Sequence, residues 1–236
     1  IAVHDIVLDR GSDRPIVWLG ADDGLWRASL TAADLERVSV PVIDAADLEA
    51  QNISDLADLA DADRSQAQLL LCPIEALWSD HSGHLWLGSG SVVAQFDVHL
   101  GLGRSFQPFE EGGTARTITD IVGTPGARIW IASAGAGVAQ YMFDDAGLLA
   151  AAGNLGSSAE GGLDTDTVRS LAIDQDGTVW FASPVGVFRY QVWAWLEANV
   201  RLDALVVNDL LYDNGGTVWV ATGGEGIQRR DGLYAN

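Results

Sequence analysis

Short apolar runs recur along the chain in one order, separated by small and polar residues. A run of about six residues leads through a turn to a second run, which carries a tryptophan with glycine or alanine two residues later, and a third short run follows. Runs of this length, rich in Val, Ile and Leu, are typical of buried β-strands. The order occurs five times, with its tryptophans at Trp18, Trp86, Trp130, Trp180 and Trp219.

The residues around each tryptophan indicate how a copy folds. A large indole ring near a residue with little or no side chain suits stacked sheets, because the ring fills the space above its small neighbour. An aspartate followed three residues later by a glycine favours a tight turn, since the aspartate binds its own backbone and glycine tolerates positive φ. This turn sequence precedes the second run at Asp80–Gly83, Asp174–Gly177 and Asp213–Gly216.

From Trp86 onward the tryptophans are about 40 to 50 residues apart, which is the period of a four-stranded propeller blade. The sequence therefore predicts an all-β fold, a β-propeller of four-stranded antiparallel blades, with five blades and a degenerate sixth as the alternative. We expect a single domain over 1–236 with an insertion at 41–71. Its repeats are expected at approximately 1–40, 72–110, 115–152, 165–200 and 204–236.

The interval before Trp86 is longer than the others by about 24 residues, and the break falls near 32–71. The acidic piece 53–63 favours a short helix, with Ile53, Leu56 and Ala60 on one stripe. In the alternative, 53–59 and 67–72 are two strands of a degenerate blade. We favour an insertion that is partly helical, and we expect its aspartates to form a solvated face rather than a calcium site.

Composition narrows the function classes. All 13 basic residues are arginines, against 33 acidic ones, and the formal net charge is −20. This charge repels phosphate backbones and anionic lipid, so we expect neither a nucleic-acid partner nor binding to a membrane surface. The longest apolar runs are too short to cross a bilayer, so we expect no direct membrane insertion. The absence of lysine excludes Schiff-base chemistry and a Walker-type phosphate loop. Cys72 alone cannot form an intramolecular disulfide, which leaves the cellular compartment open.

The copy that begins at Gly162 carries a family resemblance. Its leading loop is Gly162-Leu163-Asp164-Thr165-Asp166, its turn is Asp174 to Gly177, and its second run is Val179-Trp180-Phe181-Ala182-Ser183. These residues resemble the two-component regulator propeller repeats of bacterial hybrid histidine kinases and related secreted propellers. The resemblance implies a propeller scaffold and a sensor role. The loop sequence returns at 232–236, so five repeats in phase fit either a ring closed by its end blades or part of a longer array.

Propeller topology indicates where binding residues gather. In a four-stranded blade, the loop that leads into the first strand and the loop after the second strand emerge on the same face of the disc, and loops on a rigid scaffold are where recognition usually occurs. We expect ligand contacts from these loops and from the starts of the inner strands. The candidates are Asp22, Asp23, Arg116, Asp164, Asp166, Arg169, Asn208 and Glu225.

Catalytic signals are weaker. His4 begins an inner strand and is the candidate for a metal-dependent, lyase-like reaction, but we expect no glutamate at a comparable place in the other repeats. His81 and His84 flank a turn, where solvent exposure is expected rather than a metal pair. Cys72 precedes Pro73 in an apolar run and is expected to be buried and inert. Trp193 and Trp195 alternate on an outer strand and are expected to pack against a neighbouring blade or the insertion.

The sequence thus favours a non-catalytic binding module. We expect an extracytoplasmic sensor-type propeller, periplasmic or extracellular, that recognises a small molecule, a glycan or a protein through one disc face. It requires no cofactor and no metal, and neighbouring domains of a larger chain or complex are its other expected partners. The alternatives are a structural subunit that docks in a larger complex and, after that, a lyase-like enzyme.

Overall fold

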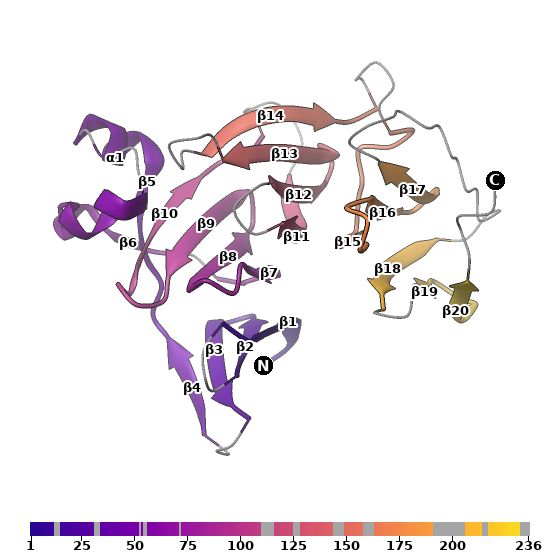
Figure 1. Ribbon diagram of the computed structural model, residues 1–236, viewed down its shortest axis with the longest axis horizontal. Helices are drawn as coiled ribbons and strands as arrows, with labels where there is room; N and C mark the ends of the chain where they lie inside the picture. The colour runs from indigo at the N-terminus through magenta and orange to yellow at the C-terminus, as the bar shows by residue number, and fades with distance from the viewer. Residues whose placement is uncertain are drawn as a thin grey trace.

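The computed structural model describes residues 1–236 except 12–14, 31–33, 52, 54–55, 71, 110–115, 125–127, 144–148, 158–162, 191–205, 214–216 and 232–236. Five β-sheets are arranged around a common axis, each with its first strand innermost (Figure 1). The predicted all-β, five-bladed propeller is therefore confirmed. The alternative with a degenerate sixth blade is wrong, because the 41–71 segment joins the second sheet instead of forming a sheet of its own.

The first and third blades each have four antiparallel strands in chain order. Blade 1 consists of β1 (Val3–Asp9), β2 (Ile16–Ala21), β3 (Gly24–Ser29) and β4 (Leu35–Val38). Blade 3 consists of β11 (Thr117–Thr124), β12 (Arg128–Ala134), β13 (Val138–Phe143) and β14 (Leu149–Leu155).

The last two blades have three strands each within the described residues. Blade 4 consists of β15 (Ser170–Ile173), β16 (Val179–Ser183) and β17 (Gly186–Tyr190), and blade 5 of β18 (Val207–Tyr212), β19 (Thr217–Thr222) and β20 (Gly226–Asp231). The predicted run with Trp193 and Trp195 lies outside the described residues.

Blade 2 holds β7 (Ala76–Ser79), β8 (His84–Ser89), β9 (Val92–Asp97) and β10 (Leu102–Phe106), and it is widened by the insertion. From the insertion, β5 (Pro41–Asp44) pairs in parallel with β10 and β6 (Gln68–Leu69) pairs with β5. Between them lie α1 (Ala45–Ala50), η1 (Leu56–Asp61) and η2 (Arg64–Gln66), which confirms a partly helical insertion.

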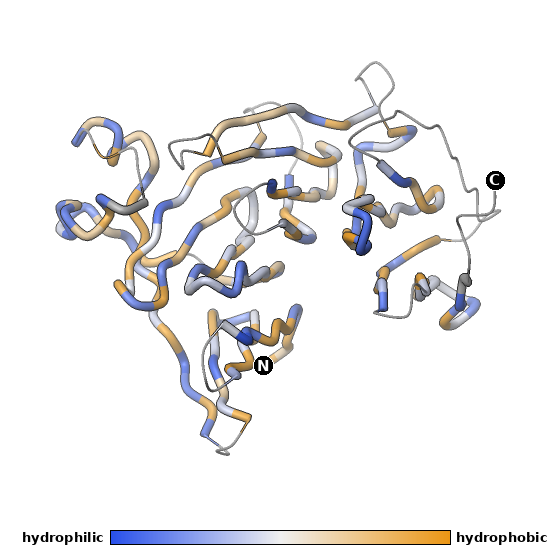
Figure 2. The backbone as a smooth tube through the Cα atoms, viewed as in Figure 1, coloured by the Kyte–Doolittle hydropathy of each residue, from blue (hydrophilic) through white to orange (hydrophobic). Residues whose placement is uncertain are grey.

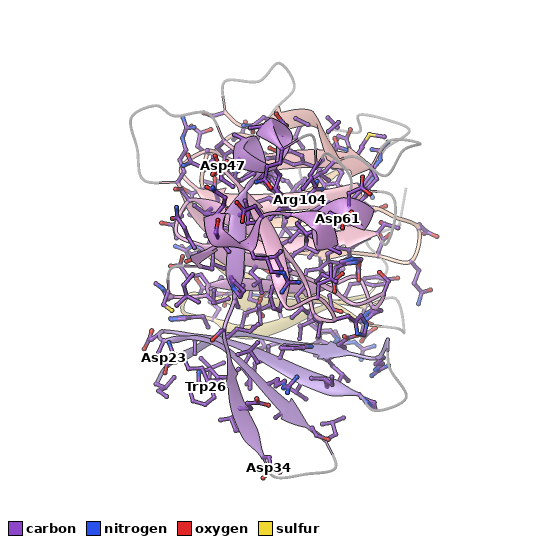
Figure 3. The ribbon with its side chains drawn as sticks, turned by 90° about the vertical axis from the view of Figure 1, so that its left-hand side faces the viewer. Asp23, Trp26, Asp34, Asp47, Asp61 and Arg104 are labelled. Carbon is purple, nitrogen blue, oxygen red and sulfur yellow. The ribbon has the colours of Figure 1, made fainter. Side chains whose placement is uncertain are left out.

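The insertion packs on the rim of blade 2 through a small apolar cluster. Ile43, Leu48 and Leu59 are buried there against Leu102 of β10. Figure 3 shows Asp47 and Asp61 of the insertion on the same rim as Arg104 of β10, and Asp23 and Trp26 on blade 1. Among the described residues of the insertion, Asp47, Asp58 and Asp61 are exposed, as a solvated face requires.

In blades 4 and 5 the aspartate of the Asp-x-x-Gly turn holds the tryptophan as well as the chain reversal. Asp174 Oδ1 accepts the backbone N–H of Asp176 and of Thr178, while its Oδ2 accepts the indole N–H of Trp180 at 3.1 Å. Asp213 repeats the arrangement, with Oδ2 accepting the indole N–H of Trp219 at 2.8 Å. The glycine of the turn has the positive φ expected of it, +78° at Gly177. One carboxylate thus satisfies both the turn and the buried indole.

Four of the five tryptophans lie in the seams between blades and form the core. Trp18, Trp86, Trp130 and Trp180 are fully buried. Each belongs to an apolar cluster that joins its own blade to the next one, as Trp18 does with Ile74 and Leu77 of blade 2. Trp219 in blade 5 has the same position and the same hydrogen bond as Trp180, yet it is only half-buried.

This pair of tryptophans provides a matched test of how much the seams stabilise the fold. Trp180→Ala is expected to lower the free energy of unfolding by about 3–5 kcal/mol, because a buried aromatic side chain is replaced by a cavity. Trp219→Ala removes an equivalent indole from an open face and should cost roughly half as much or less. Urea unfolding of both variants measures the difference. Equal costs would contradict the view that seam burial stabilises the blades.

Candidate binding face and cavity

The predicted grouping of loops on one face is confirmed by hydrogen bonds between them. Gly135 N–H and Gly137 N–H, in the loop after β12, both donate to the carbonyl of Asp166 in the loop that leads into blade 4, each at 2.8 Å. Ile118 N–H, at the start of β11, donates to Gly90 O in the loop after β8. Each such pair links one blade to the next, so this face, here called the loop face, is braced by its own backbone.

A cavity of about 720 Å³ opens beside blade 3 on the loop face. Its size falls within the range of small-molecule sites, which is about 300–1,000 Å³. Small residues line much of it, at Gly135, Ala136, Ala139, Ala151, Gly153 and Gly156. Polar and aromatic groups line the rest, at Gln107, Pro108, Phe109, Arg116, Tyr141, Asn154 and Asp166.

Two of the predicted binding residues, Arg116 and Asp166, are brought together at this cavity. Asp166 accepts the backbone N–H and the hydroxyl of Ser157, both at 2.7 Å, and these bonds lower the pKa of its carboxyl group. The carboxylate is therefore charged at neutral pH and fixed in place. Tyr141 donates to Pro108 O at 3.3 Å, and burial raises the pKa of its phenol, so the hydroxyl stays protonated.

Arg169 and Asn208 form a second pair, at the starts of the inner strands of blades 4 and 5. The Arg169 guanidinium donates to Asn208 Oδ1. They occupy equivalent positions in neighbouring repeats, which explains why they meet. The structure places this pair outside the 720 Å³ cavity.

The remaining predicted residues are scattered over the loop face. Asp22 accepts from His4 Nε2 at 2.7 Å and from the Ala2 amide, and these bonds lower its pKa. Asp23 accepts the indole N–H of Trp26 at 2.9 Å, which gives it a structural role. Asp164 and Glu225 are exposed and do not line the cavity. The eight candidates thus do not form one site.

The inner strands show one residue that the sequence analysis missed. Glu75 N–H donates to Gly88 O, and Arg169 N–H donates to Ala182 O, so Glu75 and Arg169 are equivalent in their blades. The expectation that no glutamate stands at a place comparable to His4 is therefore wrong. Glu75 precedes Ala76, which pairs with Gly88, and His4 precedes Asp5, which pairs with Gly20, so the two are equivalent although the residues after them differ. Glu75 accepts the Gly90 amide at 3.0 Å, while His4 is bonded to Asp22.

Three aspartates, Asp5, Asp120 and Asp209, occupy the position that follows this one in their inner strands, each beside a register shift in the strand pairing. They are here called the axial aspartates. Two of them accept a backbone N–H of the following blade, from Leu77 to Asp5 at 2.7 Å and from Leu171 to Asp120 at 2.6 Å. Burial raises the pKa of Asp120 to about 7, against the opposing effect of the Leu171 hydrogen bond, and the charge of Asp5 adds to the rise.

The turn histidines do not converge on one point. His84 contacts Asp80 at 2.8 Å and Asp97 at 3.8 Å, while His81 contacts Asp9 of blade 1 at 3.3 Å. Within the described residues there is no group of three or more His, Cys, Asp or Glu side chains that could hold a metal ion. Cys72 is exposed, not buried as expected, because it lies in a bend between β6 and β7 outside the sheet.

Sheet order, buried tryptophans and braced loops define the class of this protein as a β-propeller. The profile of the family described as Two component regulator propeller matches residues 162–184, which confirms the resemblance at the start of blade 4. No curated protein sequence matches the chain. No helix in the described residues is long and apolar enough to cross a membrane.

Solved structures share the fold at low sequence identity. An extracellular domain described as that of the hybrid two component system BT4673 from B. thetaiotaomicron aligns with a TM-score of 0.64 and 17% identity, covering 98% of this chain and 29% of that one. The corresponding domain of BT3049 aligns with a TM-score of 0.61 and 19% identity, covering 99% of this chain and 27% of that one. PorZ, a surface component of the type-IX secretion system of Porphyromonas gingivalis, aligns with a TM-score of 0.58 and 18% identity. The alignment covers 96% of this chain and 32% of PorZ. The chain thus spans less than a third of each.

The axial aspartates predict a pH-dependent stability. With a folded-state pKa near 7 and an ordinary value of 3.8, Asp120 is preferentially protonated in the folded state, so its contribution to stability is lost as pH rises toward and through 7. Between about pH 5 and pH 8, wild type should therefore lose stability relative to Asp120→Asn, which cannot titrate. Urea unfolding at several pH values measures this difference.

The matched control is Asp63→Asn. Hydrogen bonds from Ser65 lower the pKa of Asp63, so its carboxyl group does not titrate in this range. The difference between wild type and Asp63→Asn should be constant with pH. A constant difference for Asp120→Asn as well would show that Asp120 carries its charge throughout.

Proposed function

We propose that the chain is a non-catalytic binding module of the sensor type, which takes a small molecule or a glycan into the cavity beside blade 3. The observation that carries this proposal is the 720 Å³ cavity on the loop face, with one guanidinium, one fixed carboxylate and two aromatic rings in its lining. Ligand sites are concave and combine apolar surface with a few positioned polar groups. A polar molecule with one apolar face matches this lining.

The chemistry of the lining supports binding rather than turnover. Among the described residues, the side chains that line it include no histidine, cysteine or lysine. Both oxygens of Asp166 already accept hydrogen bonds from Ser157, and the Tyr141 hydroxyl is bonded to Pro108. Such groups orient a ligand, whereas a general base must be available to accept a proton from it. His4, the candidate for a lyase-like reaction, is bonded to Asp22 and does not line this cavity.

The proposed location of the protein is outside the cytoplasm, either periplasmic or extracellular. Three structures that share the fold are described as extracellular domains of two component systems or as a bacterial surface component. In this setting the propeller would be one module of a larger sensor or assembly, and ligand binding would be passed on through the blades.

Filling the cavity tests the proposal. Ala136→Phe places a ring in the cavity from the loop after β12, whereas Val185→Phe places the same ring at the equivalent, exposed position of blade 4. A panel of mono- and oligosaccharides and short peptides is screened against wild type by thermal shift, and binders are measured by calorimetry. We expect Ala136→Phe to weaken binding about tenfold or more, which is about 1.4 kcal/mol, and Val185→Phe to bind as wild type does.

Two outcomes would count against this function. Equal loss of binding in both variants would place the ligand elsewhere on the loop face. Unchanged binding by Ala136→Phe, with its unfolding transition also unchanged, would show that the cavity is not the site.

A further inference from the structure

The two end blades expose apolar residues at positions that are buried in the other blades. Ile227 in β20 pairs with the small residue two positions after the tryptophan, and it is 74% exposed. Its equivalents in the other four blades, Leu25, Val93, Val138 and Val187, are at most 4% exposed. Leu211, the neighbour of Trp219 in the sheet, is 64% exposed.

Blade 1 shows the complementary exposure on its opposite side. Ile6 in β1 is 61% exposed, whereas its equivalents in the other four blades, Leu77, Ile121, Leu171 and Leu210, are at most 6% exposed. In each of those blades this residue packs against the blade before it. The first and last blades stand apart in Figure 1, and Figure 2 shows hydrophobic residues in both of them.

The axial aspartate of blade 5 gives an independent sign. Asp5 and Asp120 each bond a backbone N–H of the following blade. Asp209 instead has two hydrogen bonds from the described residues, from its own Leu210 N–H at 2.8 Å and from Ser170 of the preceding blade at 2.6 Å. Both reach Oδ1, whereas Asp5 and Asp120 accept the N–H of their own strand on Oδ1 and that of the following blade on Oδ2.

We propose that the end face of blade 5, formed by Leu211, Trp219 and Ile227, is covered by at least one further blade of the same repeat. Its occupant must present what every internal seam presents, an inner strand with an apolar residue in the place of Ile121 and a backbone N–H for Asp209. The new contact continues the four existing seams with the same chemistry. This inference is independent of the ligand cavity, which lies beside blade 3.

Two other occupants fit the observations less well. Blade 1 of the same chain does not cover this face, because Ile6 on its facing side is itself exposed. A second copy would bring together two chains with a formal charge of −20 each, and such repulsion opposes association. The chain also spans less than a third of the two extracellular sensor domains and of PorZ, so there is room in such proteins for further blades.

The test compares the 236-residue chain with an extended chain in which residues 167–236 are appended a second time. The junction keeps the repeat in phase, because 232–236 repeats the loop sequence of 162–166. In both chains Cys72→Ser removes the exposed native thiol, and Ile227→Cys in the first copy places a thiol on the end face. Val185→Cys, on an exposed loop of blade 4, is the control. The rate of reaction with a thiol reagent reports coverage.

We expect the thiol at position 227 to react at least about tenfold more slowly in the extended chain, because a following blade buries it as Val93 and Val138 are buried. The control thiol should react equally fast in both chains. Equal rates at position 227 would overturn the proposal, as would failure of both this extension and a shorter one of 167–206 to fold. Slow labelling in the 236-residue chain would also overturn it, pointing to a second copy if protection rises with concentration and to blade 1 if it does not.

Discussion

The stacking of one indole ring between neighbouring sheets is the interaction on which the rest of this structure depends. A three- or four-stranded sheet cannot bury both of its faces alone, so each blade is stable only in contact with its neighbours. The tryptophan fills the space that the narrow blades leave between them, and the glycine or alanine two residues later gives the ring room. In blades 4 and 5 the Asp-x-x-Gly turn fixes the ring further by accepting its N–H, as Asp174 does for Trp180. Loops, cavity and axial carboxylates are all placed by these seams.

Much of this arrangement could be predicted from the sequence because a repeat supplies its own confirmation. Five copies of one pattern, with tryptophans about 40 to 50 residues apart from Trp86 onward, predict blades even when each run alone is ambiguous between strand and buried helix. The insertion resisted prediction, since nothing in its composition indicates that β5 pairs in parallel with β10. Glu75 was missed for a related reason. Its blade has Ala76 where the other four have aspartate or serine, so the polar register of the inner strands is interrupted in blade 2.

The candidate site was only partly predictable. Arg116 and Asp166 were named from their loops, and the structure brings them to one cavity. The rest of the lining comes from residues with little signal in a sequence, above all the alanines and glycines of β13 and β14. A cavity is an absence of side chains, and small residues in a strand are also what close sheet packing requires. Only the fold distinguishes these two uses of small residues. The loops alone likewise did not separate Arg116 and Asp166, which line the cavity, from Asp23 and Glu225, which do not.

Asp5 and Asp120 each accept a hydrogen bond from a backbone N–H group of the following blade. Any residue other than proline offers such a donor. A blade joined in this way makes almost no demand on the side-chain identity of its neighbour at the axis, so a repeat can be duplicated, lost or exchanged in a gene without a matching change next door. The departures at Ala76 and Ser170 are consistent with this tolerance. In evolutionary terms, a carboxylate that binds a backbone N–H accepts almost any residue in the next blade, so propellers of this kind can diverge in sequence while their architecture persists.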